Sequence, residues 1–375
     1  RFSGDVYLRV ISMRTFPTAI IRVFELDKIF TICVVLYVFF GAPAAYGQDT
    51  SYKDPGYDTN YIKSFRDNLV VTLVSASAGN EISAVDKKGN PLTFATNLPT
   101  SFGVGLDYKW LTFEYTSSFG RTGVPEKGYT KMKSVGFGLT TRKFWFRNFY
   151  QNTQGYYMKN PEYFNPDFNP ATDIYPFRND VRSSIYYATL NYGFNHRRFS
   201  NIAAIWQLER QKKSAGTFTT GLSFSMAEYQ SDSALFTEQF ESNFDKSEAI
   251  TDFSFVLYGI NAGYLHTFSF TKSRKFFISL TLIPGISYQE GTARFEDTNL
   301  RIKKNALGLH SEGRIVAGCN GDRWYGSITA ISYVVTSAFE GTNPFSQGYT
   351  FGRIAVGYKF KMKETKSPFL KKLGL

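Results

Sequence analysis

Three side chains that could take part in chemistry, His310, Glu312 and Arg314, lie close together in this chain. Their spacing of two residues places all three on one face if the stretch is a β-strand. A histidine near a carboxylate could act in acid–base chemistry, and the whole set could bind a charged solute. The intervening Ser311 would point to the opposite face, so a hydrolase that used His310 would need a serine from a neighbouring strand.

Seven other charged residues fall on the polar face or at the ends of similar stretches. The complete candidate set is Asp107, Lys109, Glu114, Arg142, Arg182, His310, Glu312, Arg314, Arg353 and Lys359. One interpretation is a charged constriction or ligand site in a pore. The other is an internal network of ion pairs that fills a narrow barrel, which is favoured because small barrels fill their interiors with side chains.

The sequence contains few residues in the patterns that metal sites or nucleotide-binding sites require. The chain has only three histidines, and none lies in a cluster with metal-ligand spacing. The segments GVGLDY and GFGLTT contain Gly-x-Gly but lack the third glycine and the following helix of a nucleotide-binding loop. We therefore expect no enzyme activity, no catalytic residues, no metal and no cofactor.

Period-two alternation of apolar and polar residues recurs along the chain and indicates strands. Phe102, Val104 and Leu106, for example, alternate with Gly103 and Gly105. The predicted strands are 68–78, 101–110, 111–120, 131–142, 143–153, 182–195, 198–209, 215–229, 251–268, 275–289, 305–318, 323–337 and 349–362. Several exceed the usual length of about 5–6 residues for soluble strands.

Short and long connections alternate between these segments. Short turns at one end and long loops at the other are typical of an antiparallel transmembrane β-barrel of a Gram-negative outer membrane, with lipid on one face of each strand and a wet lumen on the other. Aromatic residues at strand ends are expected to form the interfacial girdles: Tyr108, Trp110, Trp324, Tyr325, Tyr333 and Tyr358.

Thirteen segments conflict with the even strand number of such barrels. The stretch Tyr192–Trp206 alternates weakly, so one segment there is expected to be wrong. We predict twelve strands, with fourteen as the second choice.

The N-terminal region has the features of a cleaved secretory signal. Lys28 precedes an apolar run from Ile29 to Phe40, and small residues at Ala45 and Gly47 suggest cleavage after Gly47. Met13 is a candidate start. The expected organisation is 1–47 upstream residues and signal peptide, 48–66 periplasmic segment, 67–362 barrel and 363–375 basic tail.

The net charge of +12 at pH 7 would suggest nucleic acid for a cytosolic protein. For an exported chain it fits anionic lipid headgroups or cell-wall polymer better. We expect no nucleic-acid partner, contacts with outer-membrane lipids and lipopolysaccharide, a small solute as a further ligand, and a monomer.

Three segments, YDTNYIKSF (Tyr57–Phe65), NHRRFS (Asn195–Ser200) and QKKSAGTF (Gln211–Phe218), resemble a family of outer-membrane barrels from Bacteroidota, the domain of unknown function 4421. The resemblance covers nearly all of the mature chain. It implies location and architecture, and it brings no activity or site residues. The aromatic strand ending YKF (Tyr358–Phe360) resembles an insertion signal, but fifteen residues follow it, which departs from common outer-membrane barrels.

The expected function is a narrow channel or small-solute binding barrel with a charged lumen. The alternatives are a structural or assembly barrel without transport and, less favoured, a barrel lipid hydrolase. A soluble exported β-sandwich is disfavoured because Val, Phe and Leu dominate one face of almost every segment.

Overall fold

The computed structural model describes residues 56–85, 91–119, 122–163, 165–233, 250–270, 275–295, 301–337 and 345–362. The predicted signal peptide and the basic tail 363–375 lie outside these residues. Among the described residues, no helix has the length and apolar character needed to cross a membrane.

Almost all regular structure is β-strand. The strands are β1 Ile62–Ser64, β2 Asn68–Val85, β3 Pro91–Ala95, β4 Thr100–Tyr108, β5 Leu111–Ser118, β6 Lys131–Thr140, β7 Phe144–Met158, β8 Phe177–Gly193, β9 Glu209–Gln211, β10 Ala215–Gln230, β11 Ile250–Phe270, β12 Phe276–Phe295, β13 Arg301–Asn320, β14 Trp324–Ser337 and β15 Phe345–Lys361. The helices are short: the 3-10 helices η1 Pro125–Lys127 and η2 Pro161–Tyr163, and the α-helix α2 Asn201–Ile205.

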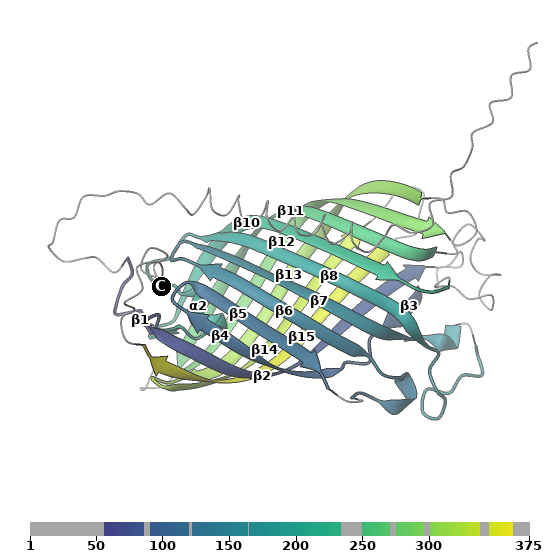
Figure 1. Cartoon of the computed structure of the whole chain (residues 1–375). Helices are drawn as coiled ribbons and strands as arrows, with labels where there is room; N and C mark the ends of the chain where they lie inside the picture. The colour runs from purple at the N-terminus through teal and green to yellow at the C-terminus, as the bar shows by residue number, and fades with distance from the viewer. Residues whose placement is uncertain are drawn as a thin grey trace, which may run out of the picture. The chain divides into compact units, whose positions relative to one another are not determined.

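Twelve of the described strands form one closed antiparallel barrel. Its strand order is β2-β4-β5-β6-β7-β8-β10-β11-β12-β13-β14-β15, and β15 pairs with β2 to close it (Figure 1). The short β3 pairs with the far end of β2 and briefly with β7. The prediction of twelve strands is confirmed.

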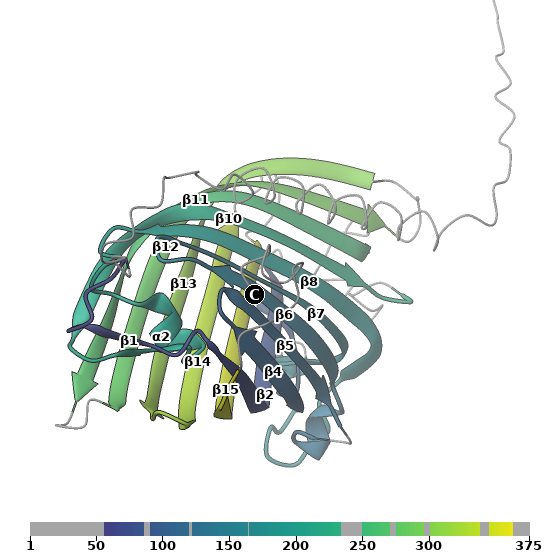
Figure 2. The same ribbon diagram turned by 60° about the vertical axis from the view of Figure 1, so that its left-hand side comes forward.

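The predicted strand 198–209 is wrong, and this error accounts for the odd count. That stretch holds α2, whose first turn is capped by Ser200 accepting a hydrogen bond from the Ala203 amide at 3.1 Å. The following β9 pairs with the N-terminal β1. We call residues 194–214 the plug, because α2 lies inside the ring of strands at one end of the barrel (Figure 2).

The plug defines the two ends of the barrel. At the plug end lie the turns β4–β5, β6–β7 and β13–β14, the end of β11 and the start of β12, together with the start of β2 and the end of β15. The longer connections between β5 and β6 and between β7 and β8 lie at the opposite end of the barrel, which we call the loop end. Short turns are typical of the periplasmic end of outer-membrane barrels.

Each strand separates an apolar outer face from an inner face. On β13, Leu307, Leu309 and Ile315 are 83%, 62% and 56% exposed, whereas the alternating His310 and Glu312 are 3% and 5% exposed. An outer wall of exposed aliphatic side chains beside a buried charged face is the arrangement that lipid outside the barrel requires.

Two of the predicted girdle residues face inward instead. Trp324 is 62% exposed, so the next residue, Tyr325, points into the barrel and is 3% exposed. Tyr333 is also inward and 8% exposed. Alternation along β14 decides both cases, because only one of two consecutive residues can face the lipid.

Large and small side chains complement each other across the inner wall. The ring of His310 lies over Gly259 of β11 and Gly285 of β12. A Cβ built on Gly259 would lie 2.4 Å from Cε1 of His310, and its three nearest atoms all belong to that ring. Glycine at this position makes room for the histidine.

The Gly259→Ala change is therefore expected to lower the free energy of unfolding by about 1–3 kcal/mol through overpacking. The effect should largely disappear in a His310→Ala background, which a double-mutant cycle of denaturant unfolding would measure. Gly313→Ala is the matched control, because its new Cβ would come no closer than 4.0 Å to other atoms. A Gly259→Ala effect that persists without His310 contradicts this packing.

Candidate functional site

The structure gathers most of the predicted charged residues inside the barrel. Seven of them are on the inner face: Asp107, Glu114, His310, Glu312, Arg314, Arg353 and Lys359. Sequence periodicity placed these residues because inward and outward positions alternate strictly along a strand.

Three candidates lie elsewhere. Lys109 lies in the turn after β4, with φ of 53° and its Nζ 5.4 Å from the ring centre of Tyr108. Arg182 is exposed on the outer face near the loop end of β8. Charge is tolerated there because a strand end extends beyond the hydrocarbon layer. Arg142 lies in the turn between β6 and β7 and reaches the plug.

An ion pair spans the middle of the lumen. Nη2 of Arg147 on β7 donates to Oε2 of Glu312 on β13 at 2.6 Å. These strands are five steps apart in one direction around the barrel and seven in the other. The pair therefore joins nearly opposite walls.

Other polar groups complete the environment of this pair. The Tyr187 hydroxyl donates to the same Glu312 oxygen at 3.1 Å, and Nη1 of Arg314 lies 3.7 Å from the second oxygen. Arg314 also donates to Thr281 at 3.2 Å and to Asn201 of the plug at 3.3 Å. Buried charges are tolerated when they are paired and hydrogen-bonded in this way.

A second inner cluster lies between β5 and β15. Arg353 donates to both carboxylate oxygens of Glu114, with distances of 2.6–3.2 Å, in a bidentate pair. The Arg353 guanidinium lies 6.0 Å from the ring centre of Trp206 in the plug. Asp107 interacts electrostatically with the same arginine.

Aromatic side chains fill the lumen beside the ion pairs and toward the loop end. Phe149 of β7 stacks on Tyr349 of β15 with ring centres 5.1 Å apart, and Tyr187 of β8 contacts Tyr333 of β14 at 4.5 Å. Each of these pairs also joins strands five steps apart. The lumen is thus crossed by ring contacts as well as by the charged pair.

His310 has no catalytic partner in this arrangement. Neither of its ring nitrogens has a hydrogen-bond partner among the described residues, and its ring packs against glycines. Ser311 faces outward, as alternation predicted. The geometry contains no nucleophile and base within hydrogen-bond reach at this position.

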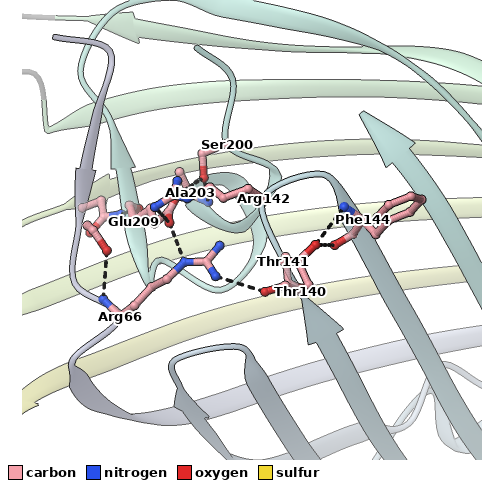
Figure 3. Close-up of polar contacts among 10 residues, drawn as sticks. Arg66, Thr140, Thr141, Arg142, Phe144, Ser200, Ala203 and Glu209 are labelled. Carbon is pink, nitrogen blue, oxygen red and sulfur yellow. Dashed lines mark hydrogen bonds and ion pairs between the residues drawn. The ribbon is translucent and has the colours of Figure 1, made fainter. Parts of the chain in front are cut away.

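Glu209 holds the plug against the barrel, and alternation did not identify it. This carboxylate is fully buried and accepts hydrogen bonds from Nε of Arg66 at 2.6 Å, Nη1 of Arg142 at 2.8 Å and Oγ of Ser200 at 2.6 Å (Figure 3). Burial lowers the pKa of Arg142 below its usual value, and the charge of Glu209 opposes that shift. The sequence signal was weak: Glu209 is the last residue of the predicted strand 198–209, which overlaps the weakly alternating stretch Tyr192–Trp206.

A second group of ion pairs, which we call the second anchor, holds the plug and the N-terminal segment at the turn between β13 and β14. Asp322 accepts from Lys63 and from Arg210 of β9, each at 2.6 Å. Lys359 donates to the side chain of Asn320 and to the Gly321 carbonyl. The hydrogen bond from Lys63 lowers the pKa of Asp322, against the opposing effect of partial burial, and the charge of Arg210 adds to the lowering.

A small cavity lies where the plug meets the β6–β7 turn. The cavity lined by Arg142, Trp145, His196 and Glu209 measures about 10 Å³, enough for at most one water molecule. No group of three or more His, Cys, Asp or Glu among the described residues could hold a metal ion.

A closed antiparallel sheet with an apolar outer wall and a filled, charged interior defines a β-barrel of the outer-membrane type. The family model described as Domain of unknown function (DUF4421) matches residues 56–360, and the chain belongs to this family. The Bacteroidota origin that the resemblance implied stays a prediction. No curated protein matches the chain.

Solved outer-membrane proteins are similar to this chain at low identity. They include the outer membrane protease OmpT from Escherichia coli (8% identity, TM-score 0.37, covering 80% of this chain and 98% of that chain). The translocator domain of autotransporter NalP from Neisseria meningitidis has 9% identity, a TM-score of 0.31 and coverage of 91% and 98%. The P. putida toluene transporter TodX has 7% identity, a TM-score of 0.27 and coverage of 79% and 91%. The class assignment rests on this chain's own closed sheet.

Removing the carboxylate of Glu209 is expected to release the plug without unfolding the barrel. Glu209→Ala leaves two guanidiniums without their shared partner, which should cost about 3–5 kcal/mol of plug-docking free energy. Native-state hydrogen exchange at residues 203–211 measures this opening. The control Glu81→Ala breaks the exposed pair with Lys159 at the loop end and should cost about 0–1 kcal/mol. Equal effects of the two changes would contradict the role of Glu209.

Lowering the pH is expected to weaken the second anchor, the ion pairs of Asp322 with Lys63 and Arg210. Because the folded-state pKa of Asp322 is lowered, its ion pairs stabilise docking above the unfolded value of about 4, and that contribution is lost as pH falls through the folded value. Exchange of β1 and β9 amides, corrected for intrinsic rates, should therefore increase at acidic pH in the wild type.

The Asp322→Asn variant should show the faster exchange already at neutral pH, with little further change on acidification. Because the Asp322 side chain is 55% exposed, high salt should weaken the wild-type anchor as well. Unchanged protection in Asp322→Asn at neutral pH would rule this anchor out.

Proposed function

We propose that the protein is an integral outer-membrane barrel without a standing pore, which acts as a structural or assembly barrel through its two exposed ends. The observation that carries this proposal is the contact between Arg147 and Glu312 from nearly opposite walls. A solute path through the barrel centre would have to pass these two side chains.

The free-energy cost of separating the contacts that cross the lumen supports a sealed state. Opening the centre requires separation of a buried ion pair, and leaving one such charge unpaired costs about 3–5 kcal/mol. The aromatic contacts at Phe149 and Tyr187 and the docked plug would have to be displaced in addition. Thermal fluctuation therefore leaves an open path rare.

Insertion in the outer membrane is the localisation that the outer wall supports. Leu222, Leu282 and Ile354 are 57%, 60% and 57% exposed although they are aliphatic. The closed sheet pairs its strands on both sides, so no open edge meets hydrocarbon. Phospholipid and lipopolysaccharide are the partners this surface fits, and the monomer is the proposed state.

A gated narrow channel or small-solute binding barrel is the second candidate. It is favoured by the way the plug is held, through ion pairs at Glu209 and Asp322 that a ligand or partner could exchange for its own contacts. A lipid hydrolase has no such support, since the ring nitrogens of His310 have no hydrogen-bond partner among the described residues.

Conductance in planar bilayers distinguishes the two candidates. The wild type is expected to give no channel steps, because side chains cross its lumen. The quadruple variant Arg147→Ala, Phe149→Ala, Tyr349→Ala, Glu209→Ala removes three of these side chains and also releases the plug. It should produce channel steps, and it serves as the positive control that the assay detects an opened lumen of this barrel.

Steady wild-type steps would contradict the sealed state. If their ion selectivity changed with Glu312→Gln, they would establish the channel instead. Steps that appear only after addition of a solute would favour the gated alternative.

A further inference from the structure

Basic and aromatic residues are adjacent in sequence around the plug-end rim of the barrel. Each doublet lies where a strand begins or ends, and we call their cations the basic ring: Lys109 beside Tyr108, Lys143 beside Phe144, Lys275 beside Phe276, Arg323 beside Trp324 and Lys361 beside Phe360. Of these five cations, only Lys109 belonged to the charged set expected in the lumen.

The aromatic partners mark the depth of the membrane interface. Phe144, Phe276, Trp324 and Phe360 are 40–62% exposed on the outer wall. Some of them contact neighbouring rings: Trp324 lies 4.7 Å from Tyr358, Tyr358 lies 4.6 Å from Phe360, and Phe144 lies 5.1 Å from Tyr192, measured between ring centres. Aromatic side chains at strand ends form the girdle at headgroup level in such barrels.

The cations of the ring are available for an external anion. Lys143, Arg323 and Lys361 are exposed, and their side chains form no ion pair with the described residues. The acidic groups Glu209 and Asp322 at this end are already paired with cations of the plug, the N-terminal segment and Arg142. The exposed Asp67 also lies at this rim, next to Asn68, the register partner of Lys361, but it forms no ion pair with a ring cation. No described acid therefore neutralises Lys143, Arg323 or Lys361 through an ion pair.

The loop end shows a different arrangement. Several of its cations are paired with a neighbouring acid: Lys159 with Glu81 at 2.6 Å, Arg178 with Asp180 at 2.7 Å, and Arg294 with Asp252 at 3.5 Å. The loop end also has exposed cations that form no ion pair with a described residue, namely Lys131, Lys133 and Arg182. What distinguishes the plug end is that its cations lie beside lipid-facing rings at successive strand ends.

From this juxtaposition we infer that the basic ring binds the phosphates of anionic phospholipid headgroups in the periplasm-facing leaflet. A lysine or arginine at headgroup depth attracts anionic lipid and donates charge-assisted hydrogen bonds to its phosphate oxygens. Cell-wall polymer fits less well, because these cations sit at the girdle rather than on protruding loops. The lipid belt would fix the depth and tilt of the barrel.

The inference rests on the proposed membrane insertion, and its test separates the two. The wild type is reconstituted into vesicles of phosphatidylcholine with a minor fraction of phosphatidylglycerol. Electron paramagnetic resonance of spin-labelled lipids then gives the association of each lipid with the barrel surface. Failure to insert would overturn the proposed function, whereas insertion without lipid preference would overturn only the inference.

We expect a severalfold preference for phosphatidylglycerol over phosphatidylcholine, since one favourable Lys or Arg contact corresponds to roughly a fivefold local enrichment. The variant Lys143→Gln, Arg323→Gln, Lys361→Gln should lose most of it, as should the wild type in 1 M salt. The charge-conserving variant Lys143→Arg, Arg323→Lys, Lys361→Arg should keep it. Heat-modified migration in electrophoresis checks that each variant is folded.

Two results would overturn the inference. One is an unchanged lipid preference in the glutamine variant. The other is loss of the preference when the outward cations at the loop end are changed instead, by Lys131→Gln, Lys133→Gln and Arg182→Gln. Binding of purified peptidoglycan that depends on the same ring, without any lipid preference, would assign the surface to the cell wall.

Discussion

The closing pairing of β15 with β2 is the constraint on which the rest of this structure depends. In hydrocarbon an unpaired backbone amide costs several kcal/mol, so a sheet can stay there only if it has no edge. Closure gives every strand one face toward lipid and one toward the interior. The exposed Leu309 and Ile315 and the buried Glu312 and Arg314, all on β13, are direct consequences of that separation.

Side chains cross the interior of this closed barrel. Here the volume is taken by Arg147, Tyr187, Phe149 and their partners, which meet across the lumen, while glycines opposite His310 leave room for its ring. Charges withdrawn from water need partners, and the two inner ion pairs supply them. The contacts that stabilise the interior are also the ones on which the proposed sealed state rests.

Buried charges are also paired where the plug meets the rim of the barrel at the plug end. Residues 194–214 bring their own buried acid, Glu209, to arginines from the N-terminal segment and from the β6–β7 turn. The acids Glu209 and Asp322 at this rim are paired with cations of the protein itself. The outward cations of the basic ring therefore face the surroundings of the barrel. Both proposals made for this chain therefore concern its ends and rim.

Periodicity and connection length in the sequence determined the class of fold, the number of strands, the position of the irregular segment and the inward side of His310, Glu312, Arg314, Arg353 and Lys359. These are local properties, because side-chain direction in a strand has a period of two. Only the tertiary structure decided that Arg147 meets Glu312, that Glu209 holds the plug, that Tyr325 and Tyr333 face inward and that Arg182 lies outside. A period assigns a face to a residue, but which faces meet across a lumen depends on strand order, register and closure, which join residues as far apart in sequence as Arg147 and Glu312.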